Sequence, residues 1–140
     1  MRISKNLTET GQIATEVAVN LKGGEVIGLV GELGAGKTTF VQALADSLGI
    51  KEKVASPTFV LMKVYSVIGH QSISKLVHVD AYRLRDAEEL KNIGLLDYLG
   101  QPDTVTVIEW ANQVKDILPP DSRMITISPG EGENDRTIDF

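Results

Sequence analysis

The fold of this chain is decided by the stretch 26–39, which reads Val26-Ile27-Gly28-Leu29-Val30-Gly31-Glu32-Leu33-Gly34-Ala35-Gly36-Lys37-Thr38-Thr39. Its first five residues are apolar or small, as in a buried strand. The residues that follow carry glycines at positions 31, 34 and 36 and then Lys37-Thr38, which completes the pattern of a P-loop. An apolar helical face comes next and is expected to end at Gly49 as its C-cap. A strand that turns through glycines directly into a helix predicts an α/β fold.

The P-loop pattern predicts a phosphate site because of what its backbone and side chains offer. A helix N-terminus presents unpaired amide donors and the positive end of the helix dipole. Lys37 is placed to reach the β- and γ-phosphates, and Thr38 to give its hydroxyl to Mg²⁺. The alternative is a chance match in a glycine-rich turn, and the flanking strand and helix argue against it. The expected nucleotide contacts of the loop are Glu32, Leu33, Gly34, Ala35, Gly36, Lys37, Thr38 and Thr39.

The rest of the chain shows further helical and strand patterns. Apolar residues at i, i+4 spacing predict a helix over 9–21 with Thr8 as its N-cap. The other expected elements are strands over 59–65 and 75–79 joined as a hairpin around Gly69, a helix over 86–93, a strand over 104–108, and a terminal hairpin of 123–128 with 136–140. Together they predict an α/β protein with a single domain over 1–140, a P-loop NTPase sandwich whose mixed, largely central β-sheet is flanked by helices. The order of the strands in the sheet does not follow from these patterns.

The composition limits the class of protein. Its 140 residues, 42% hydrophobic and 24% charged, fit one compact globular domain. Cysteine is absent, which excludes disulfides, thiolate metal sites and cysteine nucleophiles. The net charge of −5 disfavours direct binding of nucleic acid, so any contact with RNA is expected to run through a partner. Neither a secretion signal nor an apolar stretch of membrane-spanning length is apparent, and we expect a cytoplasmic protein without membrane contact.

Two carboxylates stand at the ends of apolar runs. Asp80 follows the run 76–79, the Walker B arrangement in which the carboxylate binds Mg²⁺. Glu109 follows the run 105–108 and is expected to orient or deprotonate an attacking water, or to assist the metal. Each acid has the alternative of a solvated residue at a strand end, but ligands of open α/β sheets bind at those ends. The expected metal ligands are therefore Thr38, Asp80 and Glu109, and the expected catalytic residues are Glu109 and Lys37.

Other residues carry weaker signals. Thr58, in the tripeptide Ser-Pro-Thr, occupies the place where a threonine of phosphate-switch proteins reaches Mg²⁺ and the γ-phosphate, although an ordinary proline turn explains it equally well. Trp110 follows Glu109 and either lines the site or fills a gap in the core. His78, inside a strand pattern, is expected to be a packed histidine with satisfied hydrogen bonds. Arg83 and Arg85 are candidates to complement phosphate charge, but for either taken alone solvation at the surface is the expected state.

The sequence favours adenine over guanine nucleotides. Residues 97–100 match the DxxG pattern of GTPases, but they follow a helical pattern instead of a buried strand. The Asn-Lys-x-Asp element that usually reads guanine does not occur in the chain. ATP with Mg²⁺ is therefore the expected cofactor.

Taken together, these motifs resemble the TsaE (YjeE) family of small bacterial P-loop ATPases. The resemblance covers nearly the whole chain and rests on Gly31 to Thr39, the Ser56-Pro57-Thr58-Phe59 element, His78-Val79-Asp80-Ala81-Tyr82-Arg83-Leu84, Glu88-Glu89-Leu90, Ile93-Gly94-Leu95 and Ile108-Glu109-Trp110. One departure follows the last motif, where Ala111-Asn112 stands in place of the more usual proline and acid.

The resemblance implies a role in forming N6-threonylcarbamoyladenosine at position 37 of tRNAs that read codons beginning with A. Members of the family act with a TsaB–TsaD heterodimer, in which TsaD transfers the threonylcarbamoyl group, and tRNA is met through that complex. The resemblance also implies that Lys37 and Thr38 hold the triphosphate and its metal, Thr58 senses the γ-phosphate, and Asp80 binds Mg²⁺. Glu109 would promote hydrolysis, and Trp110 would border the nucleotide.

Two other functions remain open from the sequence. A small-molecule kinase of the P-loop type typically needs a lid with several arginines, whereas this chain has five, scattered from Arg2 to Arg136. A regulatory module that binds nucleotide without hydrolysing it is the second alternative. An arginine supplied by a partner raises P-loop hydrolysis by about 10³–10⁵. With no obvious finger of its own, the chain is expected to be a weak ATPase until a partner binds.

Overall fold

The computed structural model of the chain describes residues 1–57 and 61–140. Its strands are β1 (Arg2–Ser4), β2 (Val26–Val30), β3 (Met62–Ser66), β4 (Lys75–Asp80), β5 (Thr104–Glu109), β6 (Arg123–Pro129) and β7 (Arg136–Asp139). Its helices are α1 (Leu7–Ala18), α2 (Lys37–Ser47), α3 (Glu88–Asn92) and the short 3₁₀ helices η1 (Leu95–Asp97), η2 (Ala111–Gln113) and η3 (Lys115–Ile117).

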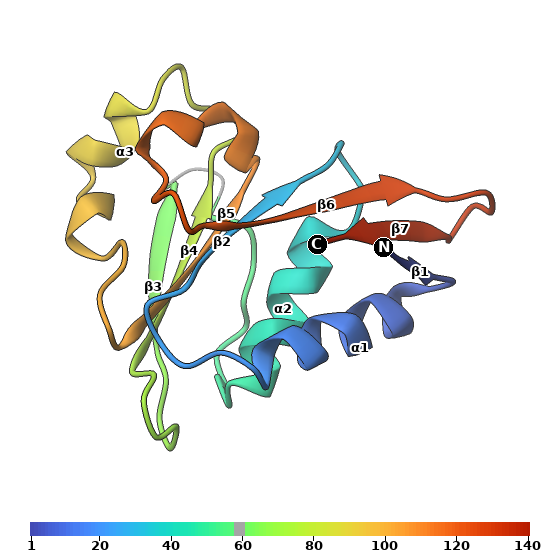
Figure 1. Cartoon of the computed structure of the whole chain (residues 1–140), viewed down its shortest axis with the longest axis horizontal. Coiled ribbons are helices and arrows are strands. Elements are labelled where there is room, and N and C mark those ends of the chain that lie inside the picture. Colours follow the sequence, from blue (N-terminus) through green and yellow to red (C-terminus); the bar gives the residue numbers. More distant parts are fainter. Residues whose placement is uncertain (58–60) are drawn as a thin grey trace.

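All these strands form one mixed sheet in the order β1-β7-β6-β2-β5-β4-β3. The four central strands β6, β2, β5 and β4 are parallel, and antiparallel pairing adds β3 at one edge and β7 and β1 at the other. The carboxyl ends of the parallel strands meet at one edge of the sheet (Figure 1). The residues that follow β2, β4 and β5 are therefore brought together there, as the sequence predicts for the P-loop and the strand-end acids.

Helices cover both faces of the central sheet. Figure 1 shows α1 and α2 together on one face, while α3 and the 3₁₀ helices lie on the other. Two hydrophobic clusters follow this division: one includes Phe40 and Leu44 of α2, and the other Leu90 of α3 and Leu95 of η1. The mixed, largely central sheet flanked by helices is thus confirmed.

The first helix begins earlier than the sequence predicts. The side chain of Asn6 accepts a hydrogen bond from the Glu9 amide at 2.9 Å and caps α1, so the prediction of Thr8 as N-cap is wrong. An asparagine oxygen at this position satisfies one of the unpaired amides at the helix start. The short strand β1 was not predicted from the sequence, because three residues are too few to show an alternating pattern. It pairs with β7, and the two chain ends lie side by side (Figure 1).

The other predicted elements agree with the structure in type. Strands β3 and β4 pair antiparallel, as do β6 and β7, so both predicted hairpins are confirmed. Residues 59 and 60 of the strand expected over 59–65 lie outside the described residues, and β3 begins at Met62. The helix expected over 86–93 is shorter, spanning Glu88–Asn92. Leu48 caps α2, and the expected cap Gly49 follows it with φ of 83°.

Candidate nucleotide-binding site

The P-loop connects β2 to α2 at the carboxyl edge of the sheet. A Cβ atom on Gly31 would lie 2.4 Å from the carbonyl oxygen of Ile127 in β6, so only glycine fits there. Gly36 precedes α2 with φ of 105°, a conformation that L side chains rarely adopt. Within the described residues, no side chain caps the start of α2. The first amides of this helix are therefore available to an anion.

The side chain of Lys37 is buried against the loop that precedes it. Its ammonium donates hydrogen bonds to the carbonyls of Gly31 at 2.6 Å and Glu32 at 2.8 Å, and it lies 4.2 Å from the centre of the Trp110 ring. Burial lowers the pKa of Lys37, and the negative charges of Glu109 and Asp80 oppose that shift. A buried cation between two acids and an open helix N-terminus suits a polyanionic ligand.

The two strand-end acids lie directly opposite each other on neighbouring strands. Asp80 of β4 is in register with Glu109 of β5, and their exposed fractions are 6% and 2%. Thr38 donates its hydroxyl to Oε1 of Glu109 at 2.9 Å, and the other carboxylate oxygen of Glu109 lies 2.6 Å from Nε2 of His78. Asp80 accepts hydrogen bonds from the amide of Tyr82 at 2.9 Å and from the hydroxyl of Ser56.

The donors gathered here fit a magnesium ion. Mg²⁺ prefers oxygen ligands and is usually held by one or two carboxylates together with phosphate oxygens. The Thr38 hydroxyl bonds to Glu109, and Asp80 lies opposite Glu109 on the neighbouring strand. Each of the three predicted metal ligands is therefore an oxygen donor next to the P-loop.

A cleft of about 550 Å³ opens over this cluster, and we refer to it as the nucleotide cleft. It is lined by Leu7, Leu33, Gly34, Gly36, Lys37, Thr38, Thr39, Ser56, Asp80, Tyr82, Arg83, Glu109 and Trp110. Trp110 is half-buried, and its ring lies 4.8 Å from that of Tyr82 at an angle of 37°. Trp110 lines the cleft and also packs against the hydrophobic cluster that contains Leu90 and Leu95, so the structure shows both roles left open by the sequence. Arg83 is exposed and lines the same cleft.

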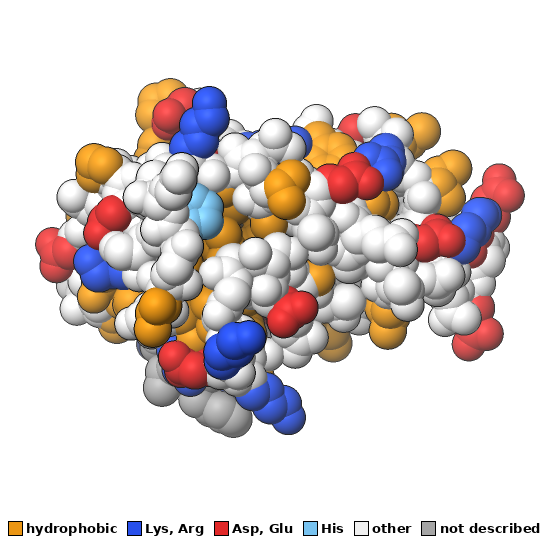
Figure 2. Space-filling view, turned by 90° about the horizontal axis from the view of Figure 1, so that it is seen from below, with side chains coloured by type: hydrophobic (Ala, Val, Ile, Leu, Met, Phe, Trp, Pro, Cys, Tyr) orange, Lys and Arg blue, Asp and Glu red, His pale blue; other side chains and the backbone are white. Residues whose placement is uncertain are grey.

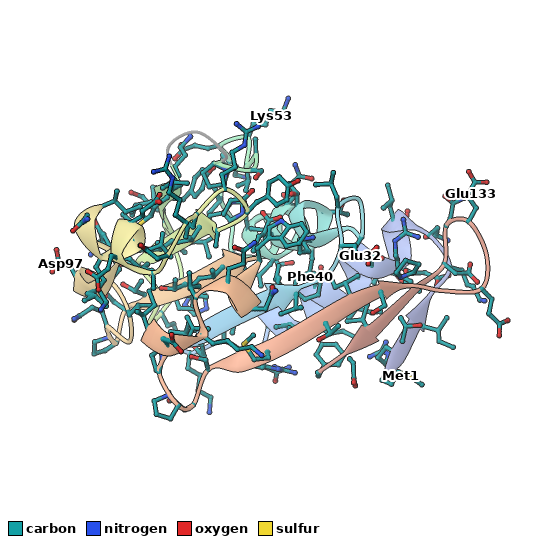
Figure 3. All side chains as sticks on the ribbon, turned by 90° about the horizontal axis from the view of Figure 1, so that it is seen from above. Met1, Glu32, Phe40, Lys53, Asp97 and Glu133 are labelled. Carbon is teal, nitrogen blue, oxygen red and sulfur yellow. The ribbon has the colours of Figure 1, made fainter. Side chains whose placement is uncertain are left out.

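The remaining predicted residues fall into three groups. Glu32 and Ala35 face a second, smaller hollow on the P-loop together with Glu133 and Arg136, and the exposed Glu32 lies beyond the start of α2 in Figure 3. Thr58 lies outside the described residues. Asp97, in the GTPase-like pattern, is at the far end of the molecule from Glu32 (Figure 3), which agrees with its dismissal.

Three contributions to the site were missed. Arg136 of β7 donates hydrogen bonds to the carbonyls of Ala35 at 3.0 Å and Gly34 at 3.3 Å, and so ties the P-loop to the terminal hairpin. Ser56 bonds to Asp80, and Leu7 at the start of α1 lines the nucleotide cleft. Ser56 belongs to the Ser-Pro-Thr element, but its bond to Asp80 was not predicted. No local pattern marks Leu7 or Arg136, because each reaches the site only through the tertiary structure.

Charges on the surface do not gather by sign on the face seen in Figure 2. Lysines, arginines and acids are interspersed there with uncharged side chains, as far as the described residues show. This mixture agrees with the net charge of −5. Within the described residues, the model contains no helix with the length and apolar character needed to cross a bilayer.

Comparison with known proteins gives a consistent result. The family model "Threonylcarbamoyl adenosine biosynthesis protein TsaE" matches residues 4–138. A protein of that name from Bacillus subtilis is 40% identical over 136 residues, covering 96% of this chain and 80% of the relative, and one from Treponema pallidum is 40% identical over 117 residues, covering 84% and 82%. The crystal structure of Bacillus subtilis YdiB superposes with a TM-score of 0.77 at 35% identity, covering 98% of this chain and 80% of that one. The chain therefore belongs to the TsaE family.

Proposed function

We propose that this chain is a Mg²⁺-dependent ATPase that supports formation of N6-threonylcarbamoyladenosine at position 37 of tRNA by driving the nucleotide-dependent cycle of a TsaB–TsaD heterodimer. Family membership supports the pathway. One observation carries the ATPase activity: Lys37, Asp80 and Glu109, all buried, meet a P-loop at the mouth of one cleft. Burying three charged groups is costly unless they pair with one another or bind a metal. P-loop hydrolysis uses a lysine and acids of this kind to bind phosphates and Mg²⁺.

Each residue has a distinct part in this proposal. The first amides of α2 and the ammonium of Lys37 bind the phosphates, for which Lys37 leaves the carbonyls of Gly31 and Glu32. Thr38, Asp80 and Glu109 hold Mg²⁺, which neutralises charge that develops on the phosphates. Glu109 also orients the attacking water, because it is a buried carboxylate at the end of β5 beside Thr38. Trp110 borders the nucleotide from the wall of the cleft.

The proposal includes low activity in the absence of partners. Among the described residues, Arg83 is the one arginine that lines the cleft, and it is exposed. Partner binding at the cleft mouth is therefore proposed to complete the charge stabilisation. The acidic chain meets tRNA through the heterodimer, and the site of action is the cytoplasm.

Two experiments test the proposal. Depletion of the protein is expected to lower threonylcarbamoyladenosine in bulk tRNA, with rescue by the wild-type chain but not by Lys37→Ala; unchanged modification after depletion removes the pathway role. Purified protein is expected to release phosphate from ATP only with Mg²⁺, slowly alone and faster with the heterodimer. ADP formation that requires a small-molecule acceptor would indicate a kinase, and binding without any turnover would indicate a regulatory module.

A further inference from the structure

His78 is a fully buried histidine in the middle of β4 that the proposed function does not use. Its side chain has no exposed surface. It lies on the same face of the sheet as Asp80, because residues two apart on a strand point to the same side. On the neighbouring strand β5 its register partner is Val107, two residues before Glu109. His78 therefore lies two residues further into the sheet than the strand-end acids, away from the cleft.

The imidazole of His78 makes one hydrogen bond, and that bond goes to Glu109. Nε2 lies 2.6 Å from Oε2 of Glu109, whereas Nδ1 has no partner among the described residues. For an ionised Glu109, which only accepts hydrogen bonds, we assign Nε2 of His78 as the donor. The unpartnered Nδ1 is then a bare acceptor, which is the less costly nitrogen to leave unpaired in the interior.

The two oxygens of Glu109 have different partners. Oε1 accepts from Thr38, which belongs to the P-loop side of the cleft, and Oε2 accepts from His78, which is not among the lining residues. In the proposed function the Thr38 hydroxyl turns to the metal. Of these two hydrogen bonds, the one from His78 is the one that does not compete with nucleotide binding.

We propose that His78 is a positioning residue that holds Glu109 in the orientation needed for hydrolysis while Thr38 engages the metal. This inference rests on the proposed function. His78 touches neither nucleotide nor metal, and it acts through the fixed direction of its bond to Oε2. A carboxylate that loses its only interior donor rotates about its side-chain torsions and leaves an unsatisfied oxygen buried. Removing such an outer partner typically costs about 10–100-fold in activity.

The test compares two substitutions at His78. His78→Leu removes the donor, and His78→Gln keeps an N–H donor at a similar reach. We expect His78→Leu to lower kcat for ATP hydrolysis about 10–100-fold, and His78→Gln to recover most of that kcat. Equal kcat in the wild type and His78→Leu would overturn the proposal, as would equal loss in both variants. His70→Gln is the matched control, because this exposed histidine bonds only to the amides of Ser72 and Ile73 in the described structure, and its kcat is expected to be unchanged.

A second readout does not depend on hydrolysis or on the folding of His78→Leu. The chain has two histidines, so the ring N–H proton of His78 is assigned by NMR as the downfield signal that His70→Gln retains and His78→Gln loses. We expect this signal to persist when a non-hydrolysable Mg–ATP analogue binds. Its disappearance on binding would overturn the positioning role. A wild-type protein that binds Mg–ATP but never hydrolyses it, alone or with the heterodimer, would refute the proposed function, and the NMR result would then decide the His78 contact separately.

Discussion

The molecule has two clefts of equal volume at opposite ends of its central strands, and they differ in how they hold charge. The nucleotide cleft, about 550 Å³, lies at the carboxyl ends. The opposite cleft, also about 550 Å³, lies at the amino ends and is lined by Val17, Asn20, Leu21, Lys22, Gly23, Gly24, Glu25, Val26, Ile27, Gly100, Pro102, Asp121 and Arg123. Volume therefore does not by itself distinguish a functional site from a surface hollow.

Buried charge distinguishes them. In the opposite cleft Lys22, Asp121 and Arg123 are exposed, and the carboxylate of Glu25 accepts from the amides of Lys22 and Gly23 at 2.7 Å each. Glu25 thus has a structural role in the turn that contains Lys22 and Gly23. The nucleotide cleft instead withdraws one cation and two acids from water, at a cost that folding alone does not require. Ionisable groups buried together in a cleft are a physical indication of a functional site.

The sharpest test of this comparison exchanges an acid for its amide in each cleft. Glu109→Gln is expected to lower kcat for ATP hydrolysis by about 10²–10⁴, because the water loses its base or orienting carboxylate. Calorimetry should still detect nucleotide binding. Glu25→Gln is the control: it is expected to cost about 1 kcal/mol of unfolding free energy through the weakened turn, with unchanged hydrolysis. Equal turnover in Glu109→Gln and the wild type would contradict the assignment of Glu109.

The second test exchanges a lysine in each cleft. Lys37→Ala is expected to weaken Mg–ATP binding by at least about 100-fold, because the phosphates lose a desolvated charge-assisted donor. Lys22→Ala should bind as the wild type does. Titration calorimetry of both variants checks the pair, with circular dichroism to confirm folding. Similar losses of Mg–ATP affinity in both variants would show that the two lysines contribute only through the overall charge of the protein.

The tie between β7 and the P-loop predicts a smaller effect. Arg136→Ala removes the donors to the carbonyls of Gly34 and Ala35, and we expect Mg–ATP affinity to fall about tenfold because the loop amides are less well held. Arg123→Ala, in the opposite cleft, is the matched control and should leave affinity unchanged. A fluorescence titration with Mg–ATP, run on both variants, measures the two affinities. An unaffected Arg136→Ala would mean that the P-loop keeps its shape without the hairpin.

The smallest effect concerns pH. Burial lowers the pKa of Lys37, so between that lowered value and the ordinary lysine pKa of about 10.4 the unfolded chain holds this proton and the folded, unliganded chain has lost it. From this group alone, the free energy of unfolding rises with pH in that alkaline window. Bound phosphates favour the charged form, so nucleotide binding there should take up protons and weaken as pH rises.

Calorimetry in two buffers of different ionisation enthalpy, at the same alkaline pH, measures this proton uptake. The variant Lys22→Ala should take up protons on binding as the wild type does, because Lys22 is exposed and lies in the opposite cleft. Binding without proton uptake at any alkaline pH would mean that Lys37 stays charged in the unliganded protein.

Most of the fold's elements were predictable because their signals are local. Apolar runs and turn residues predicted β2, β4, β5 and the pairing of β6 with β7, since each pattern spans only a few consecutive residues. The start of α1 was misplaced because several polar residues compete there, and Asn6 makes the capping bond. The strand order, and with it the parallel centre of the sheet, depends on contacts between distant segments that no local pattern encodes.

The candidate site divides along the same line. The P-loop pattern over 31–38 and the positions of Asp80 and Glu109 at strand ends could be read from the sequence, because backbone turns and strand termini follow from neighbouring residues. The bond of His78 to Glu109 and the tie of the P-loop to β7 through Arg136 could not be read from the sequence. Those contacts join segments far apart in the chain, and they exist only once register and strand order place the side chains within hydrogen-bond distance.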